Sequence, residues 1–224
     1  MNWILNIDTA VQNGSICLAK NDHSVGLVVN TNQKDHAAWL QPAIQNLFNE
    51  HCLSLHEMDA IAVSSGPGSY TGLRVVMGTA KGLCYTLDKP LIFVNTLQMM
   101  ADGATKISAG LFCPMIDARR MEVFTAVYDK DLNEVLAPCN TILTGESFKE
   151  LLNNRILFFG NGSNKFEKIL SHPNAIFQQI ESTAVHMIGL SYKNYIKENF
   201  VDLAYSEPFY GKEFYTPGAI EKIG

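Results

Sequence analysis

The stretch Ile4-Leu5-Asn6-Ile7-Asp8-Thr9-Ala10 decides the fold, and a similar stretch opens the second half of the chain. The first copy is an apolar run followed by an aspartate and a polar turn, and a second apolar run follows at 15–19. Two short apolar runs around a turn predict a β-hairpin, and the run 25–29 adds a third strand. The second copy, Cys113-Pro114-Met115-Ile116-Asp117-Ala118, leads through a turn into the run 123–128. The sequence therefore predicts two similar halves.

Strand and helix patterns alternate after each of these openings. Apolar residues at helical spacing predict helices over 36–51 and 72–87, and further helices near 97–104, 146–152, 164–170 and 183–197. Short apolar runs predict buried strands at 60–63, 91–94 and 156–159. This alternation is typical of an α/β protein. With an aspartate after the first strand of each half, it predicts the actin-like ATPase fold of acetate kinase, Hsp70 and actin, with lobes of residues 1–107 and 108–224 facing a nucleotide cleft.

Composition limits what the chain can do. Of 224 residues, 17% are charged, against roughly 25% in an average domain, which suggests that some apolar surface is covered. A formal net charge of -5 argues against this chain making most of the contacts with a nucleic acid. We expect a cytoplasmic protein, because no apolar run is long enough to span a membrane and no leader pattern is seen at the start. The five scattered cysteines predict buried, reduced thiols.

The most distinctive segment is Ser65-Gly66-Pro67-Gly68-Ser69-Tyr70-Thr71-Gly72-Leu73-Arg74, which lies between a predicted strand and a helix. Gly66 and Gly68 permit positive φ, and Ser69 or Thr71 can cap the helix. Such a turn at a helix N-terminus could hold a phosphate. It is not a Walker loop, because no lysine follows the last glycine. A capped turn that binds nothing is the alternative.

Two glycines lie inside the predicted helix 72–87. Gly78 and Gly82 each lower the stability of the helix by about 1 kcal/mol relative to alanine. We therefore expect another backbone to come close to them, either that of a neighbouring strand or that of a second chain. Arg74, Gly78, Lys81 and Tyr85 share one side of this helix. The other side is an apolar stripe that predicts core, comprising Leu73, Val76, Met77, Ala80, Leu83, Cys84 and Leu87.

The chain resembles the TsaB (YeaZ) family over nearly its whole length. The glycine segment carries the resemblance, and the supporting stretches are 7–10, 36–42, 116–124, 160–162 and 208–210. The resemblance implies a non-catalytic paralogue of TsaD, the subunit that transfers threonylcarbamoyl to the adenosine beside the anticodon. It implies a reduced second lobe, binding to a TsaD-like subunit, recruitment of a TsaE-like ATPase, indirect contact with tRNA, and homodimers when TsaD is absent. The resemblance leaves open whether ATP or ADP binds at the partner interface.

The resemblance also implies that pairing uses the helices 36–51 and 72–87. Small residues and an aromatic outside the apolar stripes suit a helix–helix interface, although packing of Trp39 under the 25–29 strand is the alternative. The predicted interface residues are Trp39, Ala43, Arg74, Gly78, Lys81, Gly82 and Tyr85. We predict no catalytic residue and no metal site, because TsaD-like subunits use a His-x-x-x-His pair and no two histidines here are four apart.

An enzyme remains the second hypothesis. A weak ATPase or sugar-kinase-like phosphotransferase would place Asp8, Thr9, Gly66, Gly68 and Asp117 around Mg-ATP, acting by positioning and electrostatics. The stretch 10–14 lacks the second glycine and the lysine of a phosphate clamp, and Asp8 capping the hairpin is the simpler alternative.

Two further features of the sequence complete these expectations. Arg119 and Arg120 follow Asp117 in a turn, which fits either a solvated turn or a contact to an anion or tRNA. The C-terminal aromatic residues are expected to fold back onto the second lobe; they are Phe209, Tyr210, Phe214 and Tyr215.

Overall fold

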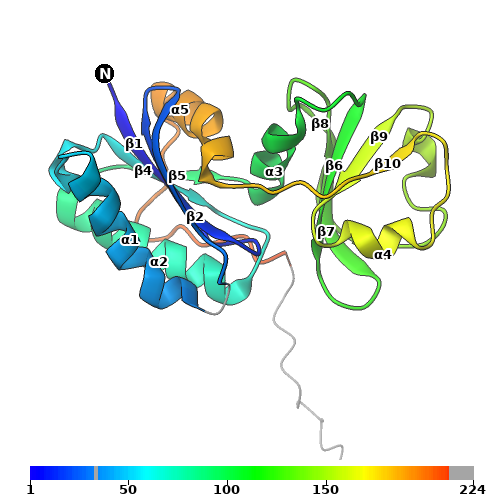
Figure 1. Cartoon of the computed structure of the whole chain (residues 1–224), viewed down its shortest axis with the longest axis horizontal. Coiled ribbons are helices and arrows are strands. Elements are labelled where there is room, and N and C mark those ends of the chain that lie inside the picture. The colour runs from blue at the N-terminus through cyan, green and yellow to red at the C-terminus, as the bar shows by residue number, and fades with distance from the viewer. Residues whose placement is uncertain (33–34, 212–224) are drawn as a thin grey trace, which may run out of the picture.

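The computed structural model describes residues 1–32 and 35–211. Its first half is a five-stranded sheet in the order β3-β2-β1-β4-β5 (Figure 1). The strands are β1 (Trp3–Asp8), β2 (Gly14–Lys20), β3 (His23–Asn30), β4 (Ala60–Ser64) and β5 (Leu91–Val94). The helical segments of this half are α1 (His36–Glu50), η2 (Leu55–Glu57), α2 (Tyr70–Leu87) and α3 (Thr96–Ala104).

The second half repeats this topology with the sheet order β10-β9-β6-β7-β8. In both sheets the first strand pairs antiparallel with the next strand and parallel with a later one, β4 for β1 and β9 for β6. The strands are β6 (Leu111–Asp117), β7 (Glu122–Tyr128), β8 (Glu134–Ile142), β9 (Ile156–Phe159) and β10 (Ala175–Phe177). The helical segments are η3 (Lys149–Leu151), α4 (Ser163–Glu167), η4 (Ala184–Met187) and α5 (Ile188–Ile196). The predicted repeat of the opening is therefore present in the structure.

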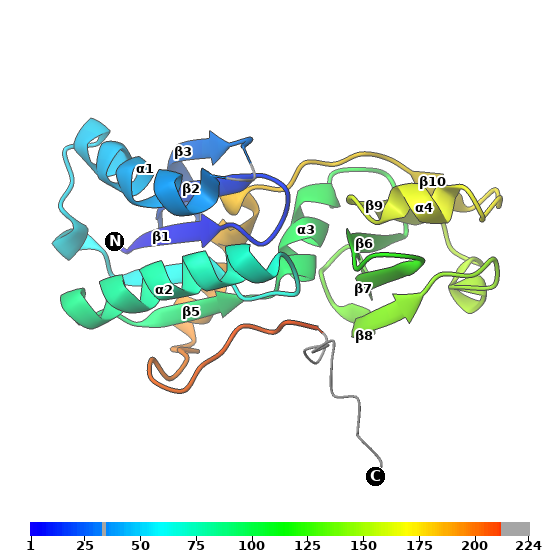
Figure 2. The ribbon, with the colours of Figure 1, turned by 90° about the horizontal axis from the view of Figure 1, so that it is seen from below.

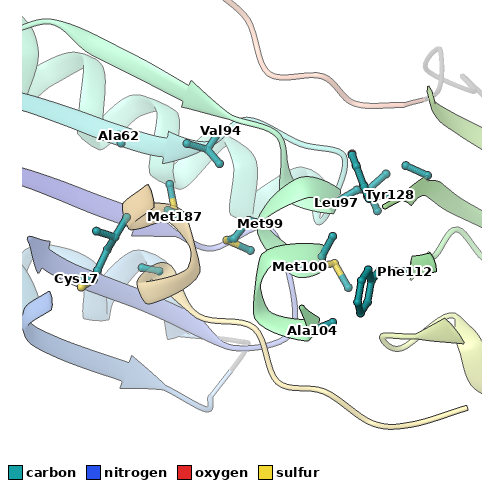
Figure 3. Close-up of a cluster of buried hydrophobic side chains, with 14 of the residues drawn as sticks. Cys17, Ala62, Val94, Leu97, Met99, Met100, Ala104, Phe112, Tyr128 and Met187 are labelled. Carbon is teal, nitrogen blue, oxygen red and sulfur yellow. The ribbon is translucent and has the colours of Figure 1, made fainter. Parts of the chain in front are cut away.

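The two sheets share one core. Helices α1 and α2 cover one face of the first sheet, while η4 and α5 contact its strands from the other face (Figures 1 and 2). Helix α3 lies between the sheets and contacts β6, β7 and η4. Its side chains join a cluster that includes Met99, Met100, Phe112, Tyr128 and Met187 (Figure 3). Burial of this apolar surface holds the two halves against each other.

The chain after Thr183 returns to the first sheet, where the N–H of Ala184 donates to Ser15 Oγ at 2.8 Å. Helix α5 contacts β1 and β5. The predicted division into residues 1–107 and 108–224 stays a prediction, but the last part of the second range packs against the first sheet. The structure places α5 and η4 where one continuous helix over 183–197 was predicted.

The chain ends with a segment along the first half that we call the C-terminal strap, residues 200–211. The N–H of Val201 donates to the carbonyl of Leu91, and the N–H of Phe209 donates to that of Ser65 at 2.8 Å. The Tyr210 ring lies 5.0 Å from Tyr70. The prediction that Phe209 and Tyr210 fold onto the second lobe was therefore wrong, because these backbone and ring contacts are with the first lobe. Phe214 and Tyr215 lie outside the described residues.

Two local predictions also need correction. The helix expected near 146–152 is a short 3-10 turn, because Phe148 has a left-handed φ of 62° that ends any regular helix. The cysteines are free, as expected, but Cys52 is exposed. Within the described residues, no helix has the length and apolarity needed to cross a membrane.

Candidate functional site

Helix α2 presents two glycines on its outer side. The helix buries its apolar stripe against the first sheet, while Gly78 and Gly82 are exposed. A Cβ atom built on either glycine would meet no other atom within 4 Å. Tyr85, one turn away from Gly82, is 83% exposed. Among the described residues, nothing in this chain uses the room that the two glycines leave.

The surface around these glycines is hollowed. A groove of about 550 Å³ runs between α2 and η2, and Gly78, Gly82 and Leu55 lie along it. A second groove of about 480 Å³ lies against α1 and shares Gln41 and Leu55 with the first. Gln41 Nε2 donates to Thr79 Oγ1 at 3.3 Å and so links the two helices. We call this surface the α1–α2 face, defined by Gln41, Leu55, Gly78, Gly82 and Tyr85.

The two predicted interface residues on α1 are less accessible than expected. Ala43 is buried in the first-sheet core together with Leu40 and Leu47, because it lies three residues after one and four before the other on the same side of the helix. Its prediction as an exposed residue was wrong. Trp39 is only partly exposed, and its ring lies 6.4 Å from that of His36.

Arg74 and Lys81 are exposed enough to meet a partner, but both already contact their own chain. The Arg74 guanidinium lies 4.2 Å from the centre of the Tyr70 ring, a cation–π geometry. Lys81 Nζ donates to the carbonyl of Ser206 at 2.7 Å. Arg74 also hydrogen-bonds with the side chain of Tyr210, so both residues hold the strap beside α2, at the edge of the α1–α2 face.

The glycine segment is occupied by its own chain. Gly66 has a φ of +106°, and a Cβ there would collide with the carbonyl of Phe209. A Cβ on Gly68 would collide with the carbonyl of Ala10. Ser69 caps α2 by accepting from the N–H of Gly72 at 3.3 Å. Glycine is needed here for close backbone packing, and the geometry favours the turn that binds nothing.

Asp8 and Thr9 are wholly buried where β1 ends. Asp8 Oδ1 accepts from the N–H of Ala10 at 2.9 Å, which caps the turn. Burial raises the pKa of Asp8 to about 6, while Ser64 and the Ala10 N–H act in the opposite direction. Thr9 Oγ1 donates to the carbonyl of Gly72 at 2.7 Å. Both side chains therefore fasten the β1–β2 turn to the start of α2.

Asp117, the counterpart of Asp8 in the second sheet, is half-exposed and ion-paired. Its Oδ1 accepts from Lys165 Nζ and from the N–H of Arg119, both at 2.7 Å. Burial alone would raise the pKa of Asp117, but these partners outweigh it and lower the pKa. Sequence reasoning missed Lys165. In the sequence, only its place on the helix after β9 points to Lys165, because the sheet topology brings the start of that helix beside the β6–β7 turn.

A cleft of about 370 Å³ lies between the two halves. It contains none of the five residues predicted to bind a nucleotide, and among the residues that the structure describes its one charged lining residue is Glu181. The lining residues are Val11, Gln12, Asn13, Thr31, Met100, Gly160, Asn161, Gln179, Ile180, Glu181 and Ser182. A polyphosphate is bound by cations or free N–H groups, and the described lining residues supply no lysine or arginine for that purpose. The described residues also contain no cluster of ligands for a metal ion.

Comparison with known proteins assigns the family. The family model "TsaD: tRNA N6-adenosine threonylcarbamoyltransferase" matches residues 18–207. The chain is 30% identical over 172 residues to the "tRNA threonylcarbamoyladenosine biosynthesis protein TsaB" of Bacillus subtilis, covering 75% of this chain and 74% of that protein. The Escherichia coli protein of the same name is 38% identical over 133 residues, covering 59% and 57% of the two chains.

A solved structure gives the same assignment. A Pseudomonas aeruginosa protein described as similar to peptidase YEAZ superposes with a TM-score of 0.82 and 25% identity, covering 95% of this chain and 100% of that one. This likeness, together with the repeated sheets, confirms the predicted two-lobed actin-like α/β fold. The chain belongs to the TsaB (YeaZ) family.

Proposed function

We propose that this chain is a non-catalytic partner subunit in the biosynthesis of threonylcarbamoyladenosine in tRNA. The names of its bacterial relatives support the pathway. The match to the TsaD family model supports descent from a common ancestor with that transferase. In this proposal the chain binds and stabilises a TsaD-like catalytic subunit in the cytoplasm, a TsaE-like ATPase joins them, and tRNA is reached through the complex.

The observation that carries the proposal is the open space at Gly78 and Gly82. Each glycine lowers the stability of the helix by about 1 kcal/mol relative to alanine, and no atom of residues 1–32 or 35–211 occupies the space beside it. A partner helix could approach the α2 backbone closely there, and the exposed ring of Tyr85 beside it offers the large contact area of an interface aromatic. The α1–α2 face therefore fits a packed helical partner.

The same face would serve a second copy of this chain. One face cannot hold both partners, so a homodimer and a heterodimer with a TsaD-like subunit would exclude each other. We therefore expect the homodimer to dissociate as the TsaD-like subunit is added.

The phosphotransferase alternative has less support. The room at Gly66 and Gly68 is filled by backbone of the same chain, and the cleft between the halves has no lysine or arginine among the lining residues that the structure describes. ATP or ADP bound at the interface with a partner stays a prediction.

The decisive experiment is co-purification of this chain with the TsaD-like subunit of the same cell, followed by a tRNA modification assay with each subunit left out in turn. We expect a complex, and modification that requires both chains. If the chain alone hydrolysed ATP and formed no complex, the proposal of a non-catalytic partner subunit would fail and the phosphotransferase hypothesis would be favoured.

Two matched variants test the face. Gly78→Leu adds a side chain to the proposed contact, whereas Gly189→Leu adds the same side chain to α5, at a glycine that is also exposed and has nothing within 4 Å. We expect Gly78→Leu to abolish co-elution and Gly189→Leu to preserve it, with the monomer remaining folded in both variants. Normal co-elution of Gly78→Leu would remove the α1–α2 face from the proposal.

A further inference from the structure

The turn between β6 and β7 carries two adjacent arginines in an uncommon backbone conformation. Arg119 has a φ of 72° and Arg120 a φ of 47°. Left-handed backbone is rare for residues other than glycine, asparagine and aspartate. Both arginines are exposed. Because left-handed dihedrals occupy a narrow region, they restrict the directions in which the two side chains leave the turn.

A lysine holds this turn from its inner side. Lys165 Nζ donates to Asp117 Oδ1 at 2.7 Å, to the carbonyl of Arg120 at 2.8 Å and to that of Glu122 at 2.7 Å. The Lys165 side chain is only 17% exposed. Asn161 Oδ1 also accepts from the N–H of Asp117 at 2.9 Å. We call residues 117–122 with this support the clamped turn.

The clamp decides which groups face solvent. Since the Arg120 carbonyl points at Lys165, the N–H of Met121 points the opposite way, because the two groups of a trans peptide are antiparallel. Asp117 is paired with Lys165, and Glu122 accepts a hydrogen bond from Asn140. The outer side of the turn therefore offers hydrogen-bond donors and a net positive charge, in a chain whose net charge is -5.

We propose that the clamped turn contacts phosphate groups of an RNA backbone. The guanidinium of arginine matches phosphate with two parallel hydrogen bonds. The turn offers a protein partner a single large apolar side chain, that of Met121, which is 37% exposed. Contacts made mainly by charge are typical of backbone binding to nucleic acid. The choice of RNA rests on the proposed function in tRNA modification.

The experiment measures tRNA binding by the assembled complex between 50 and 200 mM salt. The double variant Arg119→Asn/Arg120→Asn removes both charges but suits left-handed backbone, and Arg119→Lys/Arg120→Lys keeps the charges. Arg155→Asn is the matched control, because Arg155 is exposed and precedes β9, at the end of the parallel strands β6 and β9 that is opposite to the β6–β7 turn. We expect the asparagine pair to weaken binding and to make the slope of log K against log salt shallower by about 1 to 2.

The double lysine variant should keep the slope of the wild type, and Arg155→Asn should change neither the tRNA affinity nor the slope. An unchanged slope in the asparagine pair, or an equal loss from Arg155→Asn, would overturn the proposal. Loss of subunit co-elution with no change in the slope would assign the turn to a protein carboxylate and would also overturn it. If the wild-type chain formed no complex, the proposed function would fail separately, and the same titration with the chain alone at low salt would decide the inference.

Discussion

Two aspartates that look alike in the sequence behave differently in the folded chain. Asp8 and Asp117 each end the first strand of a sheet. Asp8 is fully buried and its pKa is raised, whereas Asp117 is half-exposed and its pKa is lowered by Lys165 and the Arg119 N–H, which outweigh its own burial. The difference arises because the second turn has a lysine beside it and the first does not pair its aspartate with any cation that the structure describes.

Asp8 makes stability depend on pH. Because its folded pKa of about 6 lies above the ordinary value of 3.8, the folded chain binds the proton more tightly than the unfolded chain does. Its contribution to stability is therefore fully present below pH 3.8 and is lost as the pH rises through about 6. We expect Asp8→Asn to raise the free energy of unfolding by up to about 3 kcal/mol at pH 8, since each pKa unit is worth about 1.4 kcal/mol.

Urea unfolding of both chains from pH 4 to pH 8 measures this effect. At pH 4 the variant and the wild type should be nearly equal. A gain of the same size at pH 4 and pH 8 would mean that ionisation is not its origin. A loss at both pH values would mean that the carboxylate itself is required for the fold.

Lys165 should contribute more to the free energy of unfolding than an ordinary exposed lysine does. Its ammonium satisfies two backbone carbonyls and one carboxylate while mostly buried. Lys165→Met should lower the free energy of unfolding by about 1 to 3 kcal/mol, the range for hydrogen bonds to charged groups. Lys168→Met, at an exposed position in the next turn, is the control and should cost little in the same urea titration. Equal costs would show that the clamp adds no stability.

Gly72 and Gly78, both in helix α2, have opposite roles. A Cβ at Gly72 would collide with the carbonyl of Thr9, whereas one at Gly78 meets nothing. We expect Gly72→Ala to destabilise the chain by about 1 to 3 kcal/mol through overpacking. Gly78→Ala should stabilise it by up to about 1 kcal/mol through helix propensity. Thermal unfolding of the isolated monomer compares the two directly. Destabilisation by Gly78→Ala would mean that this face is covered within the monomer.

Strong hydrophobic periodicity made the main elements predictable. The strands β1, β2 and β3 and the helices α1 and α2 lie within a few residues of the predicted ranges. Strand β10 was missed because it has only three residues, and β8 was missed because it contains Pro138, which is uncommon within strands. The helix near 146–152 was wrong because its spacing could not reveal the left-handed φ of Phe148.

The candidate face was predictable only in part. Glycine inside a helix is unfavourable, so Gly78 and Gly82 stood out from the sequence, and the structure shows both exposed. Arg74 and Lys81 did not reveal their contacts with the strap, because those partners are more than 100 residues away along the chain. Lys165 was missed for the same reason, since only the sheet topology brings it to the turn.

The C-terminal strap joins distant parts of the molecule. It contacts Leu91, Lys81 and Ser65 in the first half, and a Cβ at its last residue, Gly211, would collide with the Phe124 ring in the second half. We expect a chain ending at Tyr205 to be less stable than one ending at Gly211 by about 1 to 3 kcal/mol, because it loses several buried or partly buried hydrogen bonds. Chemical denaturation of the two truncated chains isolates the strap. Equal stability would show that these contacts add nothing to the fold.

The return of the chain after Thr183 to the first sheet has a consequence during synthesis on the ribosome. All five strands of that sheet are synthesised before the segment that covers their second face, which begins at Ala184. Until that segment is made, an apolar face that includes Ile4, Cys17 and Ala62 lacks part of its cover. The first lobe therefore cannot complete its fold until residues from Ala184 onward have emerged, and the uncovered apolar face favours aggregation before then.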